Sequence, residues 1–276
     1  MTKQLTLALF LIGAGLSGCQ EQTSEQGQNE PEEQQEQSET EDENTQEWTY
    51  GEDAGPENWG SLDPAFQTCA DGTEQSPINL EFSEVTESSD RERVELNYQA
   101  GEFSLANDGH TLMAHAAKPD NVLSIEDNNY KLMQFHFHTP SEHQFNGEHY
   151  EMELHLVHQN KEGELAVAGI MIKEGAENET LMPVWNKFPK EETDSNIPVE
   201  NLIDVQELLP EDADLFHYNG SLTTPPCSEQ VKWMIYEKPI SMSSEQIKQF
   251  QNIFGENHRP VQSLNDREVE LSSSNE

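Results

Sequence analysis

The sequence is poor in positive charge. Its 276 residues contain 14 Lys and Arg against 54 Asp and Glu, for a formal net charge of −40 at pH 7. Binding to nucleic acid needs concentrated positive charge, so nucleic acid is excluded as a partner. An acidic surface repels itself and dissolved salt screens that repulsion, which predicts a halophilic protein adapted to a saline or alkaline exterior. The alternative is a merely acidic secreted protein.

The chain also lacks an apolar run long enough to span a bilayer. The longest, residues 5–16, follows Lys3 and is typical of a secretory signal. It ends in Leu-Ser-Gly-Cys, which resembles a bacterial lipoprotein cleavage box in which Cys19 is lipidated. We predict a signal peptide over 1–18 and export to the cell envelope, periplasmic or at the cell surface, with membrane contact only through this anchor. An ordinary signal peptide that happens to contain Cys is the alternative.

The segment that follows has neither basic nor aromatic residues. Residues 20–47 contain 11 acidic residues and many Gln. Such a composition cannot bury enough apolar area to offset the entropy of ordering it, so residues 19–47 are predicted to be a lipidated, disordered acidic tether. The remaining residues, 48–276, contain 43 acidic and 13 basic residues and are predicted to form one domain.

Histidine is present in a pattern that indicates a metal site. Side chains alternate along a strand, so in Gln-Phe-His-Phe-His, His136 and His138 share a face. In Glu-Leu-His-Leu-Val-His, Glu153, His155 and Val157 share a face in the same way. If the two strands are neighbours, three imidazoles converge. Three neutral nitrogens suit Zn²⁺ and leave its fourth position open, which is typical of a catalytic zinc site.

Polar residues next to two of these histidines support the metal hypothesis. Gln134 lies two residues before His136, and Glu153 two before His155, so each shares its histidine's face. Ligand histidines usually donate their second ring N–H to such groups. The alternative is a half-buried strand of alternating His and Phe, which would be preferred for a lone His-x-His. The third histidine, on a strand of matching phase, favours zinc.

From about residue 48 to residue 262 the chain resembles the α-class carbonic anhydrases. The matching strings occur in the family's order: WTYG and GPENW (48–59), QSPINL (75–80), NDGHT (107–111), QFHFH (134–138), SEH (141–143), ELHLVH (153–158), LAVAGI (165–170), GSLTTPPC (220–227) and NHRPVQ (257–262). Most relatives have Trp where this chain has Thr139 and Gln159.

Short alternating apolar runs predict the fold class. They cover 102–106, 122–125, 132–138, 152–157, 165–172 and 231–236, and residues 243–254 have helical spacing. We expect a mostly β (α+β) single domain with a large twisted, predominantly antiparallel central sheet and short peripheral helices. The resemblance implies zinc at the base of a conical cleft.

The resemblance also implies an activity and residues that carry it. The activity is reversible hydration of carbon dioxide to bicarbonate and a proton, by attack of zinc-bound hydroxide, with weak esterase activity as an accompaniment. The Thr223 hydroxyl would donate to Glu142 and orient the hydroxide. His110 would shuttle the proton, because an imidazole can carry protons between bound water and buffer. Tyr50 and Asn107 would order the connecting water.

Further positions follow from the same resemblance. Gln134, Glu153 and Asn257 are the expected supports of the ligands. The predicted carbon dioxide pocket consists of Val157, Val167, Leu222, Val231 and Trp233, with Thr224 receiving bicarbonate. Cys69 and Cys227 remain once Cys19 is assigned to lipid; an even pair in an exported domain predicts a disulfide, and secreted relatives pair cysteines at these places. The bonds before Pro77 and Pro226 are expected to be cis. Structural or surface roles are predicted for His115, His143, His149, His158, His217 and His258.

Two other functions stay open at this point. One is a catalytically silent carbonic anhydrase-like binding module on the cell envelope, which loss of a zinc histidine would mark. The other is zinc scavenging, which predicts metal exchange without turnover. All three zinc histidines are present, which favours the enzyme. The sequence leaves the oligomeric state open.

Overall fold

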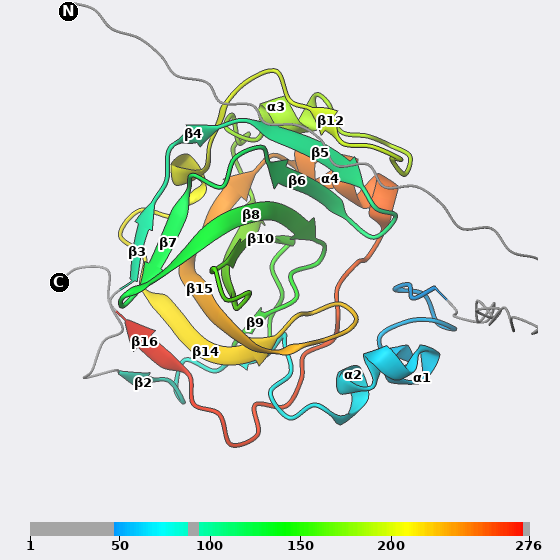
Figure 1. The fold of residues 1–276 in the computed structure, drawn as a ribbon, viewed down its shortest axis with the longest axis vertical. Helices are drawn as coiled ribbons and strands as arrows, with labels where there is room; N and C mark the ends of the chain where they lie inside the picture. The colour runs from blue at the N-terminus through cyan, green and yellow to red at the C-terminus, as the bar shows by residue number, and fades with distance from the viewer. Residues whose placement is uncertain (1–46, 88–93, 273–276) are drawn as a thin grey trace, which may run out of the picture. The chain divides into compact units, whose positions relative to one another are not determined.

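A mixed sheet of 12 strands dominates the described part of the chain, residues 47–87 and 94–272 in this computed structural model (Figure 1). The predicted signal peptide, Cys19 and nearly all of the tether lie outside the described residues. The main path of the sheet is β12 (Ile197–Pro198), β5 (Phe103–Asn107), β6 (Leu112–Ala116), β8 (Asn128–His138), β10 (Met152–Gln159), β11 (Leu165–Glu174), β15 (Glu229–Met242), β14 (Leu215–Ser221), β16 (Glu270–Ser272) and β2 (Thr86–Glu87). Beside it, β7 (Val122–Ile125) pairs with β8 and with β3 (Val94–Asn97).

Most strand pairs are antiparallel, so the predicted fold class is confirmed. The exceptions in the large sheet are β11 with β15 and β16 with β2, which are parallel. Two small sheets lie outside it: β1 (Asn79–Leu80) with β9 (Gln144–Phe145), and β4 (Ala100–Gly101) with β13 (Ile203–Asp204). All six predicted strands are present; β7 has the predicted bounds and the other five have shifted ends. The remaining strands were not predicted, and β6 and β14 are the longest of them.

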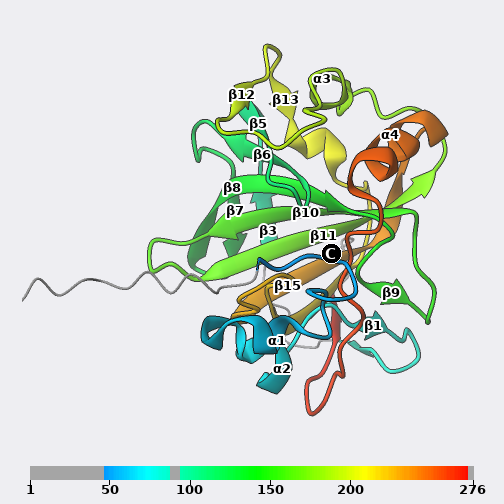
Figure 2. The ribbon, with the colours of Figure 1, turned by 90° about the vertical axis from the view of Figure 1, so that its right-hand side faces the viewer.

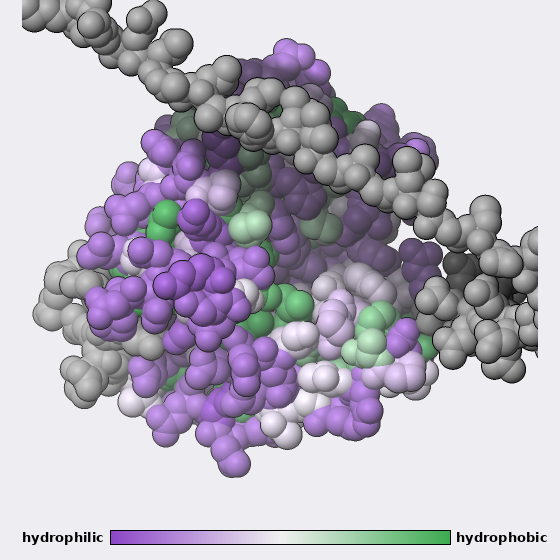
Figure 3. Space-filling view, viewed as in Figure 1, coloured by the Kyte–Doolittle hydropathy of each residue, from purple (hydrophilic) through white to green (hydrophobic). Residues whose placement is uncertain are grey.

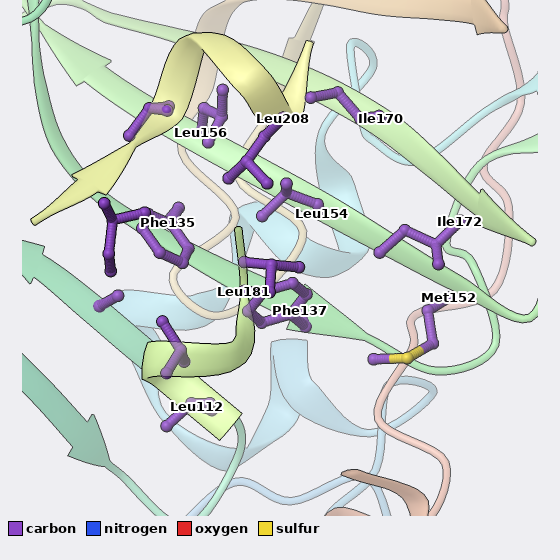
Figure 4. Packing of buried hydrophobic residues seen from close by; sticks show 14 of the residues in the cluster. Leu112, Phe135, Phe137, Met152, Leu154, Leu156, Ile170, Ile172, Leu181 and Leu208 are labelled. Carbon is purple, nitrogen blue, oxygen red and sulfur yellow. The ribbon is translucent and has the colours of Figure 1, made fainter. Parts of the chain in front are cut away.

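The main hydrophobic core covers one face of β8 and β10 (Figure 4). Phe135, Phe137, Leu154 and Leu156 are fully buried there. Their spacing of two is the spacing that places strand side chains on one face. They pack against residues of α3 (Met182–Trp185), η2 (Val205–Leu208) and neighbouring loops. The histidines that alternate with these residues consequently face the other way.

The helices are short and peripheral, as expected. α1 (Trp59–Leu62), η1 (Pro64–Phe66) and α2 (Thr68–Asp71) lie near the N-terminal end of the described chain, well apart from α4 (Ser244–Phe254) in both views (Figures 1 and 2). Ser243 caps α4 and exchanges hydrogen bonds with Gln246, so the predicted helix is confirmed with Ser243 as its cap. No described helix has the length and apolarity needed to cross a membrane.

Several covalent and backbone predictions are also confirmed. Cys69 and Cys227 form a disulfide. The Ser76–Pro77 and Pro225–Pro226 bonds are cis. Thr139–Pro140 is cis as well, which was not predicted.

Candidate metal centre

The pairing of β8 with β10 brings three histidines together. His136 lies opposite His155, and His138 lies opposite Glu153. The ring centroid of His136 is 5.0 Å from that of His138 and 5.2 Å from that of His155, and the centroids of His138 and His155 are 4.7 Å apart. One nitrogen from each ring lies within 4.8 Å of the other two. The predicted convergence of three imidazoles is therefore present.

Hydrogen bonds determine which nitrogen of each ring faces the shared point. His136 Nδ1 is 2.9 Å from Gln134 Oε1, and His155 Nε2 is 2.8 Å from Glu153 Oε1. His138 Nδ1 donates to the backbone carbonyl of Asn257 at 2.7 Å. The remaining nitrogens are Nε2 of His136 and His138 and Nδ1 of His155. Nε2 of His138 is buried without a hydrogen-bond partner, which is the condition of a nitrogen that a metal ion would satisfy.

The three histidines are held in the form that binds metal. Burial lowers the pKa of His138 to about 4, and it lowers the pKa of His136 and His155 below the ordinary value of 6.5. The neighbouring rings of His138 and His155 lower the pKa of His136 further. Neutral imidazoles are the ligand form, and a set of three such nitrogens fits zinc.

Glu153 connects His155 to a longer buried chain of hydrogen bonds. Its Oε1 also accepts from His143 Nδ1 at 2.8 Å, and its Oε2 accepts from the backbone N–H groups of Glu142 and His143, both at 2.9 Å. Burial alone would raise the pKa of Glu153, but the His143 and His155 rings and these bonds outweigh it and hold the pKa well below 4.5. Glu153 is therefore a carboxylate that fixes the orientation of His155.

The chain continues from His143 to Tyr218. His143 Nε2 is 2.6 Å from the Tyr218 hydroxyl, which is 2.8 Å from Ser76 Oγ. His143 was predicted to have a structural or surface role; it is fully buried and contacts the carboxylate behind a candidate ligand. Its place in the Ser-Glu-His string, next to Glu142, is the sequence signal that could have identified it.

Glu142 and Thr223 also meet, as predicted. Both are buried, and a side-chain hydrogen bond joins them. Glu142 Oε1 accepts the backbone N–H of Arg259 at 2.9 Å, and its Oε2 is 3.4 Å from His138 Nε2. Burial raises the pKa of Glu142 to about 7, against the lowering effects of His155 and Thr223. Arg259 is a support that the sequence reasoning did not identify.

The predicted pocket residues lie in one cluster beside the histidines. Val157 pairs with Val167 and Val167 with Trp233 across three strands. Val231 and Leu222 belong to the same hydrophobic cluster, in which Val157 and Leu222 are only partly buried. Thr224, next to Thr223, is half-buried. Figure 3 shows a hollow over β8 and β10 on a largely hydrophilic face, with hydrophobic side chains at its lower side.

His110 lies in an aromatic group at the N-terminal end of the described chain. Its ring stacks on Trp48 with centroids 3.6 Å apart and planes at 13°, and Tyr50 is 6.5 Å away. Burial raises the pKa of the Tyr50 hydroxyl, and the carboxylates of Glu142 and Asp108 raise it further. The Tyr50 side chain is thus a neutral phenol near the candidate centre.

Asn107 is placed differently from its predicted role of ordering water in the cleft. The side chain is 3% exposed. Its amide donates to the Pro189 carbonyl and its oxygen accepts the Gly109 N–H, so both groups hold the loop before His110. Asn257 supports the ligands through its backbone carbonyl, while its amide donates to the carbonyls of His110 and Phe137.

Comparison with known proteins gives a consistent family. The family described as eukaryotic-type carbonic anhydrase matches residues 54–273. A carbonic anhydrase of Nostoc sp. is 44% identical over 217 residues, covering 78% of this chain and 81% of that protein. The solved α-carbonic anhydrase of Thermovibrio ammonificans with sulfanilamide has a TM-score of 0.78 and 39% identity, and the match covers 81% of this chain and 98% of that one. Dioscorin DB3L of Dioscorea polystachya is 33% identical over 225 residues, covering 78% of this chain and 81% of that protein.

Proposed function

The chain belongs to the eukaryotic-type carbonic anhydrase family, and on that premise we propose that it catalyses the reversible hydration of carbon dioxide to bicarbonate and a proton. One observation carries the proposal. Three ring nitrogens, each oriented by a hydrogen bond on the other side of its ring, lie within 4.8 Å of one another, and that of His138 is buried and unpaired. His136, His138 and His155 would hold one zinc ion.

Zinc in such a site would act as a Lewis acid that lowers the pKa of a water molecule. The chain's own residues supply the rest. Thr223 bonds to Glu142, and Glu142 accepts an N–H from Arg259. In its ionised form Glu142 only accepts, so the Thr223 proton would then point to Glu142 and the Thr223 oxygen would be left to accept. This arrangement would orient the attacking oxygen towards carbon.

Carbon dioxide is a small apolar molecule and needs an apolar place near the reacting oxygen. Val157 is on the ligand-bearing face of β10 and packs with Val167 and Trp233. These side chains offer no ligand to zinc and no strong hydrogen bond to the substrate. They would therefore hold carbon dioxide loosely, while Thr224 would receive bicarbonate, and the same site could support weak esterase activity.

The proton would leave through His110. Its half-buried ring stands beside Trp48 and Tyr50, at the edge of the candidate centre. Replacing His110 by Ala should slow turnover mainly in dilute buffer, because the change removes the carrier and leaves the nucleophile in place. Added imidazole should restore much of the rate. Equal activity of the variant in dilute and concentrated buffer would remove His110 from this role.

A stopped-flow assay of carbon dioxide hydration tests the proposed function. The protein is measured as purified, after removal of metal with a chelator, and after zinc is returned. The proposal expects activity, its loss and its recovery, each in step with bound zinc. A silent binding module would give no turnover in any state, and a zinc scavenger would exchange metal without turnover. Either outcome would overturn the proposal.

We also propose that the enzyme works outside the cytoplasm, tethered by a lipid on Cys19, in a saline or alkaline setting. The composition supports this: 43 acidic and 13 basic residues follow the acidic tether. Raising ionic strength from about 0.01 M to 1 M shortens the screening length from about 30 Å to 3 Å. The melting temperature of residues 48–276 should therefore rise with NaCl. A flat or falling curve would assign the acidity to something other than salt.

A further inference from the structure

A row of side chains crosses the sheet on the face that carries the histidine cluster. The strand registers place His115 opposite Gln134, Gln134 opposite Val157, Val157 opposite Val167, and Val167 opposite Trp233. The part of the row on β10, β11 and β15 is apolar. The part on β6 and β8 is polar and includes a histidine that the proposed mechanism has not used.

His115 lies close to a candidate ligand without touching it. Met113 is the residue opposite His136, so His115, two residues along β6, is the diagonal neighbour of His136. Diagonal neighbours in an antiparallel pair are about 7–8 Å apart. The two rings are also close enough to interact electrostatically, since a positive charge on His115 would lower the pKa of His136. Ordered water can bridge such a distance.

The ring of His115 is free in a way that most other histidines are not. It is half-buried, and within residues 47–87 and 94–272 no hydrogen bond or ion pair of its side chain occurs. His143 and His158, by contrast, are fully buried with both ring nitrogens hydrogen-bonded. A ring without fixed partners can take up and release a proton without breaking the fold.

We propose that His115 is a second proton carrier of this enzyme, acting in parallel with His110. The inference rests on the proposed carbon dioxide hydration. In each turnover an O–H bond of water breaks, the proton crosses hydrogen-bonded water, and an N–H bond forms on the neutral imidazole. That N–H bond then breaks as a buffer base takes the proton. The ring returns to its neutral form, so nothing is consumed except the base.

The surroundings of His115 suit this cycle. The titratable or charged groups on the flanking strands are few: His136, His138 and Lys131 on the same face of β8, and Glu102 just before β5. Ser104, opposite His115 on β5, is neutral. His110 is constrained by its stack on Trp48, so its ring must leave that contact to change orientation. A second, unstacked ring would carry protons while His110 is held there.

The experiment compares four forms of the zinc-loaded protein: unvaried, His110→Ala, His115→Ala and the double variant. His217→Ala is the matched control, since His217 is half-buried on β14 and bonds to Ser272. Carbon dioxide hydration is followed in dilute and concentrated buffer, with and without imidazole, and zinc content is measured for each form.

Two parallel carriers of similar efficiency predict about a twofold loss of kcat in dilute buffer for His115→Ala and a much larger loss in the double variant than in either single variant. kcat/KM and zinc content should stay unchanged, and imidazole should restore the double variant. A double variant no slower than His110→Ala would overturn the inference while leaving the proposed function intact. A fall in kcat and kcat/KM alike at every buffer concentration would also overturn it, by showing a structural role. An unvaried zinc-loaded protein without turnover would overturn both proposals.

Discussion

The two faces of β10 are equally buried and chemically opposite. Glu153 and His155 on one face, and Leu154 and Leu156 on the other, are at most 1% exposed. The apolar face is stable because it removes hydrocarbon from water. The polar face costs free energy unless its groups find partners, and both oxygens of Glu153 and one nitrogen of His155 have them. One strand thus stabilises the fold with one face and positions chemistry with the other.

His155→Ala should give the largest effect, because it should abolish the function of the polar face and leave the packing of the apolar face intact. The substitution removes one of three candidate ligands, so we expect loss of high-affinity zinc binding and of carbon dioxide hydration. The apolar face is untouched, and the fold should persist. Zinc content by mass spectrometry, activity and circular dichroism check this. A variant that keeps stoichiometric zinc and full activity would refute the ligand assignment.

Phe137→Ala should have the converse effect. Phe137 lies between His136 and His138 but points into the core, where it contacts Trp185 and Phe250. Truncation of a buried Phe costs about 3–5 kcal/mol in the free energy of unfolding. Zinc bound per folded chain should change little. Urea unfolding measures the loss, with Met133→Ala on the same strand as control, because Met133 is 42% exposed. Equal effects of the two substitutions would contradict the division of faces.

His158 is the histidine on the apolar side of β10, and it should make the free energy of unfolding depend on pH. Burial lowers its pKa from 6.5 to about 4. As pH falls below 6.5, His158 binds a proton in the unfolded chain but stays neutral in the folded chain until about pH 4. The stability that this group contributes at pH 7 is therefore lost on acidification. The loss from this group is about 3 kcal/mol between pH 7 and pH 4. His158→Gln should have a correspondingly shallower dependence of unfolding free energy on pH. Identical slopes for both proteins would contradict the assignment.

Tyr218→Phe should give the smallest effect, since it removes only the far end of the hydrogen-bond chain that runs from His155 through Glu153 and His143. His143 Nε2 and Ser76 Oγ each lose a buried partner, which costs about 1–3 kcal/mol in unfolding free energy. The loss in zinc affinity should be well below that of Glu153→Gln, for which about 10–100-fold is expected. Zinc affinities from chelator competition give the order. A larger loss of zinc affinity for Tyr218→Phe than for Glu153→Gln would contradict this order of hydrogen bonds.

Local alternation explains why the strands and the ligand face could be predicted. Period-two spacing in 134–138 and 152–157 is a property of neighbouring residues, and it assigns each side chain to a face. It fails between Leu132 and Gln134, where a register shift places Leu132 in the core with Phe135. β14 was missed because Asn219 and Gly220 interrupt its apolar pattern, and β6 because Ala114 and Ala116 give it little hydrophobic contrast.

The supporting contacts could not be predicted in the same way. The Asn257 carbonyl that accepts from His138 is 119 residues away in sequence, and Tyr218 is 75 residues from His143. A backbone carbonyl has no signature in the side-chain pattern, so Asn257 was expected as a support only from the family resemblance and not from the strand spacing. Arg259 acts on Glu142 through its backbone N–H, which likewise has no signature in that pattern. Such contacts depend on how the loops close over the sheet.

The central claim is that the polar face of β8 and β10 holds one zinc ion with three imidazoles and leaves one position open. X-ray absorption at the zinc edge, together with metal analysis of the zinc-loaded protein, tests it most directly. We expect one zinc per chain with three histidine nitrogens at about 2.0–2.1 Å and one further oxygen from water. A fourth protein ligand, a sulfur neighbour or a spectrum unchanged by His155→Ala would contradict the account.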